Sequence, residues 1–102
     1  MKKLLMATTA MALMAGPAFA AGHGSEVKIG VILGFTGPIE SLTPTMAAGA
    51  ELAMKEVTDS GMLLQGMTVT PVRADSTCVD SAAATAAAER LVTSDGVKGI
   101  MG

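Results

Sequence analysis

Residues 27–33 have the sequence VKIGVIL, and this stretch decides the fold. It is almost continuously apolar and rich in β-branched residues, with only Lys28 near its start. A strand that is buried on both faces of a parallel sheet has this composition, because helices cover it on each side. We therefore predict that this segment is a strand of a parallel sheet.

The segment that follows this strand has helical signals at both ends. Thr43 is expected to cap the helix, Pro44 suits its first position, and Gly61 can close its far end. Apolar residues recur at a spacing of three and four, which predicts one packed face, while Glu51 and Lys55 are expected to pair on the other side. The predicted packing face consists of Met46, Ala47, Ala50, Met54 and Val57.

The second half of the chain repeats this alternation of strand and helix. A strand is predicted at residues 67–74, and Pro71 indicates an edge strand because it cannot donate a hydrogen bond to a neighbour. Asp80 is placed to cap a second helix, which Gly96 is expected to end. Residues 97–102 predict the start of a third strand. The alanine-rich second helix is expected to pack through Ala84, Ala87, Ala88 and Leu91.

The order of these elements predicts an α/β fold. The connections are long enough only for crossover helices, so the three strands are expected to be parallel with right-handed crossovers. Three strands and two helices make an incomplete doubly wound domain, β-α-β-α-β, whose sheet lacks part of its cover. We therefore expect the chain to be a piece of a longer protein.

Residues 1–20 have the organisation of an export signal. They begin with two lysines after Met1, continue with an apolar run over residues 4–15, and end with small residues that predict cleavage after Ala20. The apolar run is about 12 residues long, against roughly 20 for a transmembrane helix, so we expect no stable membrane insertion after signal cleavage. The residue directly after the cleavage site is Ala21, so no cysteine is present there to carry a lipid.

The remaining residues, 21–102, argue against several classes of function. They carry five basic and nine acidic residues, a net charge of −4, which disfavours nucleic acid as a partner. The single histidine, His23, lies in the expected N-terminal tail, so neither a catalytic set nor a metal site is predicted. Gly34, Gly37 and Pro38 do not have the spacing of a dinucleotide-binding or phosphate-binding loop, so no cofactor is predicted. We expect no enzymatic activity.

Ligands of open α/β sheets bind beyond the carboxyl ends of the strands, which here are the loops at residues 34–43 and 75–80. The first loop carries the hydroxyl groups of Thr36, Ser41 and Thr43. Hydroxyls and free amides at a helix N-terminus suit a carboxylate or another anionic group. The alternative is an ordinary strand-to-helix turn with a threonine cap, and both interpretations stay open.

Cys78 is the only cysteine of the chain. Exported proteins usually keep their cysteines paired, so an odd cysteine indicates a partner outside these residues. The alternative is an inert buried thiol.

Taken together, these segments resemble the start of the periplasmic Leu/Ile/Val-type amino-acid-binding proteins of ABC importers. The resemblance covers essentially the whole chain after the leader, and the order and spacing of its parts make it specific. The most specific parts are Gly37-Pro38, Gly49-Ala50-Glu51, and residues 75–80 with their cysteine. The matching stretches are KIGVILGFTGP, AAGAELAMKEV, GMLLQG and RADSTCVDSAAATAAAERLV.

The resemblance implies a periplasmic protein of two α/β lobes joined by a hinge, of which residues 21–102 are the N-terminal part of lobe 1, a type I lobe. It implies a monomer that grips a branched-chain or other apolar amino acid between the lobes and delivers it to the membrane permease. Two other classes stay open. One is a ligand-sensing domain of the same fold, and the other is a small independent exported protein.

The resemblance also assigns residues to the site. Glu40, Ser41 and Leu42 match the first-loop wall of the family's ligand site, and Leu42 stands where some members carry an aromatic residue. The amino acid that is bound is therefore not specified. The same resemblance implies a disulfide from Cys78 to a cysteine beyond residue 102, shortly after the third strand.

Overall fold

The computed structural model describes residues 25–102. The predicted leader, residues 1–20, and His23 lie outside this range. The predicted order of elements is confirmed, with a short 3-10 helix added before the second strand. The elements are β1 (Glu26–Leu33), α1 (Thr43–Ser60), η1 (Leu63–Gln65), β2 (Thr68–Asp75), α2 (Ser81–Thr93) and β3 (Gly99–Met101).

The three strands form a parallel sheet in the order β2-β1-β3. The apolar strand β1 lies in the middle, with Ile29 aligned between Pro71 of β2 and Gly99 of β3. Within the described part of the chain, β2 is therefore an edge strand, as Pro71 predicted. The chain moves from β1 to its neighbour β2 on one side, and the next connection then passes back over β1 to place β3 on the other side.

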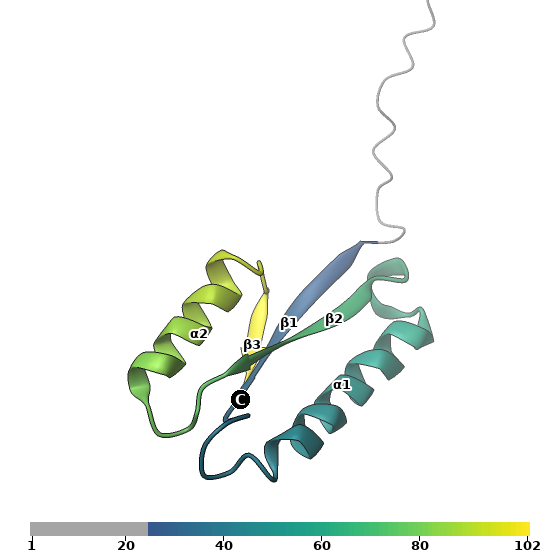
Figure 1. Ribbon diagram of the computed structural model, residues 1–102. Coiled ribbons are helices and arrows are strands. Elements are labelled where there is room, and N and C mark those ends of the chain that lie inside the picture. Colours follow the sequence, from purple (N-terminus) through teal and green to yellow (C-terminus); the bar gives the residue numbers. More distant parts are fainter. Residues whose placement is uncertain (1–24) are drawn as a thin grey trace, which may run out of the picture.

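The two helices cover opposite faces of the sheet. Arg73 of β2 binds Glu51 of α1, whereas its neighbour Ala74 packs in one cluster with Leu91 of α2. Because successive side chains of a strand point to opposite faces, α1 and α2 must lie on different sides. Figure 1 shows this arrangement, with the sheet between the two helices. The expected doubly wound α/β architecture is confirmed.

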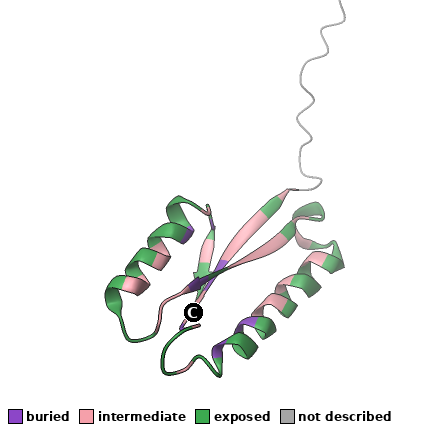
Figure 2. Cartoon of the chain, in the orientation of Figure 1, coloured by how far each residue is buried: buried purple, intermediate pink, exposed green. Residues whose placement is uncertain are grey.

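The buried core is small, and its residues come from both helices and from the strands between them (Figure 2). Leu91 is fully buried, and the predicted alanines of α2 are half-buried against the sheet, so the predicted stripe of this helix is confirmed. The buried hydrophobic residues of the described chain are Val31, Ala47, Ala74, Leu91 and Val97.

The packing face of α1 agrees with the prediction in part, because Ala47 is buried and Ala50 and Met54 are half-buried, but the other two predicted members are not packed. Met46 and Val57 are 56% and 42% exposed, whereas Glu51 and Thr58 are half-buried. The reason is that both polar residues find partners on the sheet. Thr58 Oγ1 accepts a hydrogen bond from the backbone N–H of Val69 at 2.9 Å, so the helix is turned toward its polar side.

The expected pairing of Glu51 with Lys55 is also wrong. Glu51 instead binds Arg73 through two hydrogen bonds, of 2.5 and 2.9 Å, and Lys55 binds Asp59 one turn further along α1. A planar guanidinium matches both oxygens of a carboxylate, which a lysine on the same helix cannot do.

The helix ends agree with the prediction in part. Asp80 caps α2, because its Oδ1 accepts hydrogen bonds from the N–H groups of Ala82 and Ala83, and Gly61 closes α1. Thr43 does not cap α1, since its hydroxyl donates to the carbonyl oxygen of Gly34 instead. The second helix ends at Thr93, before Gly96, which lies in the turn that leads to β3.

Candidate functional site

Two loops meet at the carboxyl ends of the parallel strands. They are the β1–α1 loop (residues 34–42) and the β2–α2 loop (residues 76–80). Figure 1 shows both loops at the lower end of the sheet, where the C-terminal end of β3 also lies. This edge is the place where an open α/β sheet binds its ligands.

Asp75, the last residue of β2, holds the two loops together. Its Oδ1 accepts hydrogen bonds from the backbone N–H groups of Phe35 at 2.9 Å, Thr36 at 3.3 Å and Thr77 at 2.9 Å. Its Oδ2 accepts from the hydroxyl of Thr36 at 2.5 Å. These donors, the Thr36 hydroxyl first among them, lower the pKa of Asp75 and keep it ionised.

Two glycines let the loops approach each other closely. A Cβ atom at Gly37 would lie 2.8 Å from the carbonyl oxygen of Thr77, and the φ of Gly37 is 98°. A Cβ atom at Gly34 would lie 2.9 Å from the sulfur of Cys78. Any side chain at either position therefore pushes the loops apart, and at Gly37 the backbone is also strained.

Arg73 connects the β1–α1 loop to helix α1. Its guanidinium carbon lies 5.2 Å from the centre of the Phe35 ring, within the range of a cation–π contact. The same guanidinium binds Glu51, and this hydrogen bonding lowers the pKa of Glu51. Asp75 thus holds the backbone of Phe35, and Arg73 contacts its ring.

The predicted site residues Glu40, Ser41 and Leu42 lie together in the turn before α1. All three are exposed, Leu42 by 61%. The turn is closed by backbone hydrogen bonds from Glu40 to Gly37 at 3.3 Å and from Leu42 to Ile39 at 2.9 Å. The structure therefore brings the three residues to the carboxyl edge of the sheet, where side chains are free to meet a ligand.

The hydroxyl groups of this loop have different roles. The hydroxyls of Thr36 and Thr43 are used inside the protein, on Asp75 and on the Gly34 carbonyl. Within residues 25–102, the hydroxyl of Ser41 has no such partner. No side chain caps the N-terminus of α1, so the threonine-capped turn expected as one alternative is not formed. An anionic group at this helix end stays a prediction.

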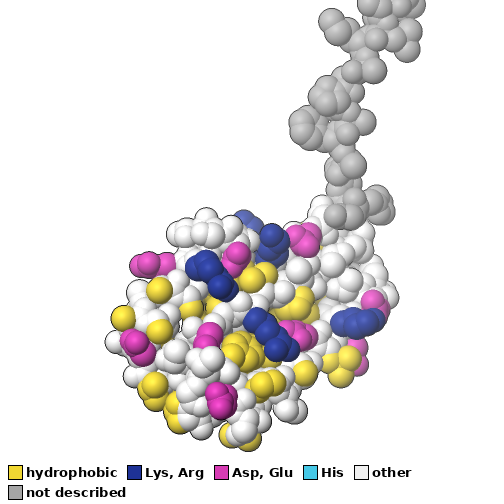
Figure 3. Space-filling model, viewed as in Figure 1, with side chains coloured by type: hydrophobic (Ala, Val, Ile, Leu, Met, Phe, Trp, Pro, Cys, Tyr) yellow, Lys and Arg dark blue, Asp and Glu magenta, His cyan; other side chains and the backbone are white. Residues whose placement is uncertain are grey.

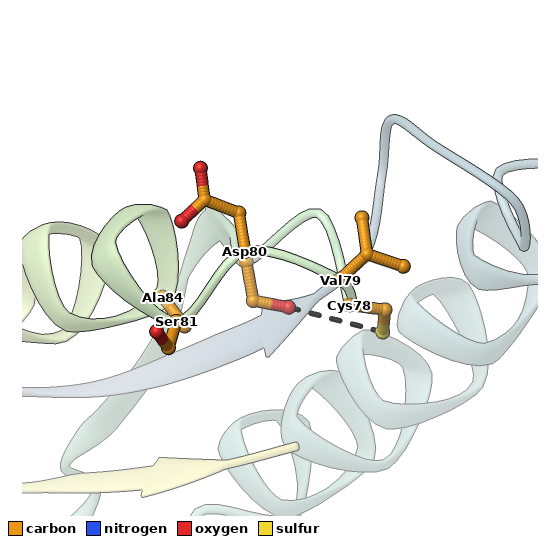
Figure 4. A pocket seen from close by; sticks show the side chains of 6 residues that line it. Cys78, Val79, Asp80, Ser81 and Ala84 are labelled. Carbon is orange, nitrogen blue, oxygen red and sulfur yellow. Dashed lines mark hydrogen bonds between the residues drawn. The ribbon is translucent and has the colours of Figure 1, made fainter.

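Cys78 lies in the β2–α2 loop and its thiol is exposed, not buried as one alternative expected. It lines a shallow hollow of about 310 Å³ at the start of α2 (Figure 4). Its sulfur lies 3.9 Å from the hydroxyl of Ser76. Thr77 and Cys78 both have left-handed backbones, with φ of 58° and 64°. The other residues that line the hollow are Ser76, Val79, Asp80, Ser81 and Ala84.

Residues 25–102 contain neither a metal-binding cluster nor a membrane-spanning helix. Nowhere in this range do three or more histidine, cysteine or acidic side chains gather closely enough to hold a metal ion. Neither α1 nor α2 combines the length and the apolar composition that crossing a bilayer requires. The face drawn in Figure 3 carries hydrophobic side chains interspersed with charges of both signs.

The role of Asp75 was not predicted from the sequence. The only local signal is the spacing of Asp75 and Thr77, since an aspartate often accepts a hydrogen bond from the backbone two residues later. Its hydrogen bonds to Phe35 and Thr36 join residues about 40 positions apart in the chain, and no local sequence pattern predicts such contacts.

Comparisons with known proteins agree with this architecture. The family model described as periplasmic binding protein matches residues 26–102. All 102 residues align at 36% identity with the Leu/Ile/Val-binding protein homolog 7 of Brucella suis biovar 1 (strain 1330) and with that of Brucella melitensis biotype 1. The chain spans about a quarter of the length of these relatives, 24%. The resemblance to Leu/Ile/Val-type binding proteins is confirmed, and the chain belongs to the periplasmic binding protein family.

Proposed function

We propose that this chain forms part of the solute-binding component of an ABC importer. The component binds a branched-chain or other apolar amino acid between two lobes and delivers it to the membrane permease. The observation that carries the proposal is the match along the whole chain to proteins named as Leu/Ile/Val-binding homologues. The open carboxyl edge of the sheet supports it, because this edge is free to face a second lobe.

In this proposal, Glu40, Ser41 and Leu42 form one wall of the site. Leu42 offers exposed apolar surface to the side chain of the amino acid, and burial of that surface contributes affinity. The carboxylate of Glu40 and the hydroxyl of Ser41 are polar groups that suit the charged end of an amino acid. The wall thus combines the apolar and polar chemistry that such a ligand presents.

The transport cycle follows from this placement. Residues 21–102 belong to lobe 1, and ligand binding stabilises a closed state in which the two lobes meet across the carboxyl edge. The permease then recognises the closed state. Residues 1–20 direct the protein to the periplasm and are removed by cleavage after Ala20. In the periplasm the protein acts as a monomer and has no enzymatic activity.

We also propose that Cys78 forms a disulfide with a cysteine further along the natural polypeptide. The exposed thiol supports this proposal, and an oxidising compartment favours the bond. Thiol labelling of the natural polypeptide before and after reduction tests it. Full labelling of Cys78 without reductant would exclude the bond.

Calorimetric titration of the natural polypeptide tests the function. We expect leucine, isoleucine or valine to bind, and lysine and aspartate to bind far more weakly, because an apolar wall cannot solvate a charged side chain. Titrations in which none of the apolar amino acids produces a binding signal would contradict the proposed function.

A pair of leucine variants tests the proposed wall. Leu42→Ala is expected to weaken binding of leucine roughly tenfold, because an apolar contact with the ligand is lost. Leu52→Ala is the matched control, since Leu52 is 57% exposed, much like Leu42, but lies on the body of α1. Because a helix rises about 1.5 Å per residue, the two leucines are separated by roughly 15 Å along the axis of α1. Equal affinities for the two variants would exclude Leu42 from the site.

A further inference from the structure

We propose that Asp75 is a positioning residue of the ligand site, a proposal that rests on the proposed function. The Asp75 carboxylate holds the β1–α1 loop in the position in which Glu40, Ser41 and Leu42 meet the ligand. Asp75 itself does not contact the ligand.

The anchoring of the β1–α1 loop leads to this inference. At its base the Thr43 hydroxyl donates to the Gly34 carbonyl at 2.8 Å, which joins the two ends of the loop. This bond fixes the width of the loop but not its direction. Direction requires a contact with another element of the fold.

Asp75 supplies that contact by hydrogen bonding. It receives the N–H groups of Phe35 and Thr36 together with the Thr36 hydroxyl, so it fixes the orientation of consecutive peptide groups as the chain leaves β1. Arg73 adds a contact to the Phe35 ring but binds no backbone group of the loop within residues 25–102. The orientation of the β1–α1 loop relative to the sheet therefore depends on the Asp75 carboxylate.

Within residues 25–102, no side-chain hydrogen bond joins the tip of the loop to the sheet. The backbone hydrogen bonds of Glu40 and Leu42 are made to Gly37 and Ile39 of the same loop, and the first turn of α1 donates to the carbonyl oxygens of Ile39 and Leu42 at 3.3 Å. The position of the tip relative to the sheet therefore depends on the segment before it. A loop that must be ordered during binding costs affinity, so a loop that is already fixed binds more tightly.

The β2–α2 loop is fixed by the same carboxylate. Asp75 also accepts from the N–H of Thr77, and Thr77 is the residue whose carbonyl lies against Gly37. One side chain thus sets the position of both loops relative to the sheet and to each other.

Three variants of the natural polypeptide test the inference. Asp75→Ala removes every hydrogen bond of the carboxylate and is expected to raise the dissociation constant for leucine roughly tenfold. Asp75→Asn keeps one acceptor oxygen and is expected to restore part of the affinity. Asp59→Ala is the matched control for the lost charge, because Asp59 is exposed and pairs only with Lys55 on α1 within the described residues. It is expected to bind like the wild type.

Hydrogen exchange of the ligand-free protein separates positioning from general stability. In Asp75→Ala the hydrogen-bonded amides of Glu40 and Leu42 are expected to exchange faster, while those of α2 keep their wild-type rates. A merely structural role would change both regions alike or leave the loop unchanged. A weaker affinity with unchanged loop exchange would also overturn the inference, since Asp75 would then act by another route.

The inference and the proposed function fail in different ways. Binding of leucine by the wild type and by Asp75→Ala with affinities within about twofold would overturn the inference and leave the function intact. Absence of amino-acid binding by the wild type would overturn both. If Asp75→Ala does not fold, Thr36→Val decides, because it removes only the hydroxyl bond. We expect a rise of roughly threefold in its dissociation constant, and a wild-type value would overturn the inference.

Discussion

The two faces of the sheet are held by different kinds of interaction. On the face covered by α2, Leu91, Ala74 and Val97 form a closed apolar cluster, joined by Ile32 and Val72 of the strands. On the face covered by α1, Ala47 and Val31 are also buried, but the contacts that join helix and sheet include polar ones. These are the Glu51–Arg73 ion pair and the hydrogen bond between Thr58 and Val69.

The two faces therefore contribute differently to the stability of the sheet and to the orientation of the helix. Apolar packing contributes free energy without fixing direction, so the α2 face mainly stabilises the sheet. Hydrogen bonds and bidentate ion pairs are directional, so the α1 face mainly sets orientation. The β1–α1 loop leads into α1, and the predicted wall of the ligand site is therefore attached to the directional face.

Leu91→Ala is the change with the largest expected effect on the α2 face. Leu91 is fully buried, and a Cβ atom added at Gly30 would lie 2.8 Å from its Cδ1, so the leucine sits directly on β1. Removing such a side chain leaves a cavity, and we expect the free energy of unfolding to fall by about 2–5 kcal/mol. Urea denaturation followed by circular dichroism measures this loss in the natural polypeptide.

The neighbouring residue supplies the control for this prediction. Val92 is 57% exposed on the outer side of the same helix, and Val92→Ala is expected to change the stability by no more than about 0.5 kcal/mol. Similar losses for the two variants would mean that the α2 face does not hold the apolar core, and the contrast between the faces would be lost.

Thr43→Val tests the α1 face and is expected to have a smaller effect. The two side chains have nearly the same shape, but valine cannot donate to the Gly34 carbonyl, and both Thr43 and Gly34 are buried. A buried acceptor without a partner costs about 1–3 kcal/mol. The same denaturation experiment measures the loss, with Thr45→Val as the control, because Thr45 is exposed on the same turn of α1. An unchanged midpoint for Thr43→Val would show that the base of the loop is not closed by this bond.

The contrast between the faces also explains which features could be predicted from the sequence. The apolar strand at residues 27–33 and the alanine stripe of α2 were predicted correctly, because burial on a regular element leaves a regular pattern. Asp80 was predicted correctly as a cap, since its partners lie within three residues along the chain.

The α1 face could not be predicted in the same way. Thr43, Glu51 and Thr58 are polar residues that face the sheet, and their partners are distant in the chain or belong to the backbone. A pattern of hydrophobicity places such residues on the outer side, which is why Met46 and Val57 were wrongly assigned to the packed side. Of the candidate site, the position of Glu40, Ser41 and Leu42 at the carboxyl edge followed from the strand order, but their support by Asp75 did not.

Acidification is expected to weaken the α1 face selectively, and its effect is the smallest of the three. Hydrogen bonding to Arg73 lowers the pKa of Glu51 below its ordinary 4.5, and hydrogen bonding, first to Thr36, lowers the pKa of Asp75 below its ordinary 3.8. A carboxyl group whose pKa is lower in the folded state contributes stability that is complete above its ordinary pKa. The contribution is then lost as the pH falls through the folded value. We therefore expect no change from these groups above pH 4.5 and a progressive loss below it.

Glu51→Gln isolates one half of this acid sensitivity. The variant is expected to lose part of the stability at neutral pH and to show a flatter decline below pH 4.5 than the wild type. Glu56→Gln removes the same charge from an exposed position of α1 and serves as the control. Urea midpoints measured between neutral and acidic pH give the slopes, and Leu91→Ala should shift the whole curve without changing its shape. Identical slopes for Glu51→Gln and Glu56→Gln would show that the ion pair with Arg73 does not hold α1 to the sheet. The directional character of that face would then rest on Thr43 and Thr58, whose hydroxyl groups do not titrate in this range.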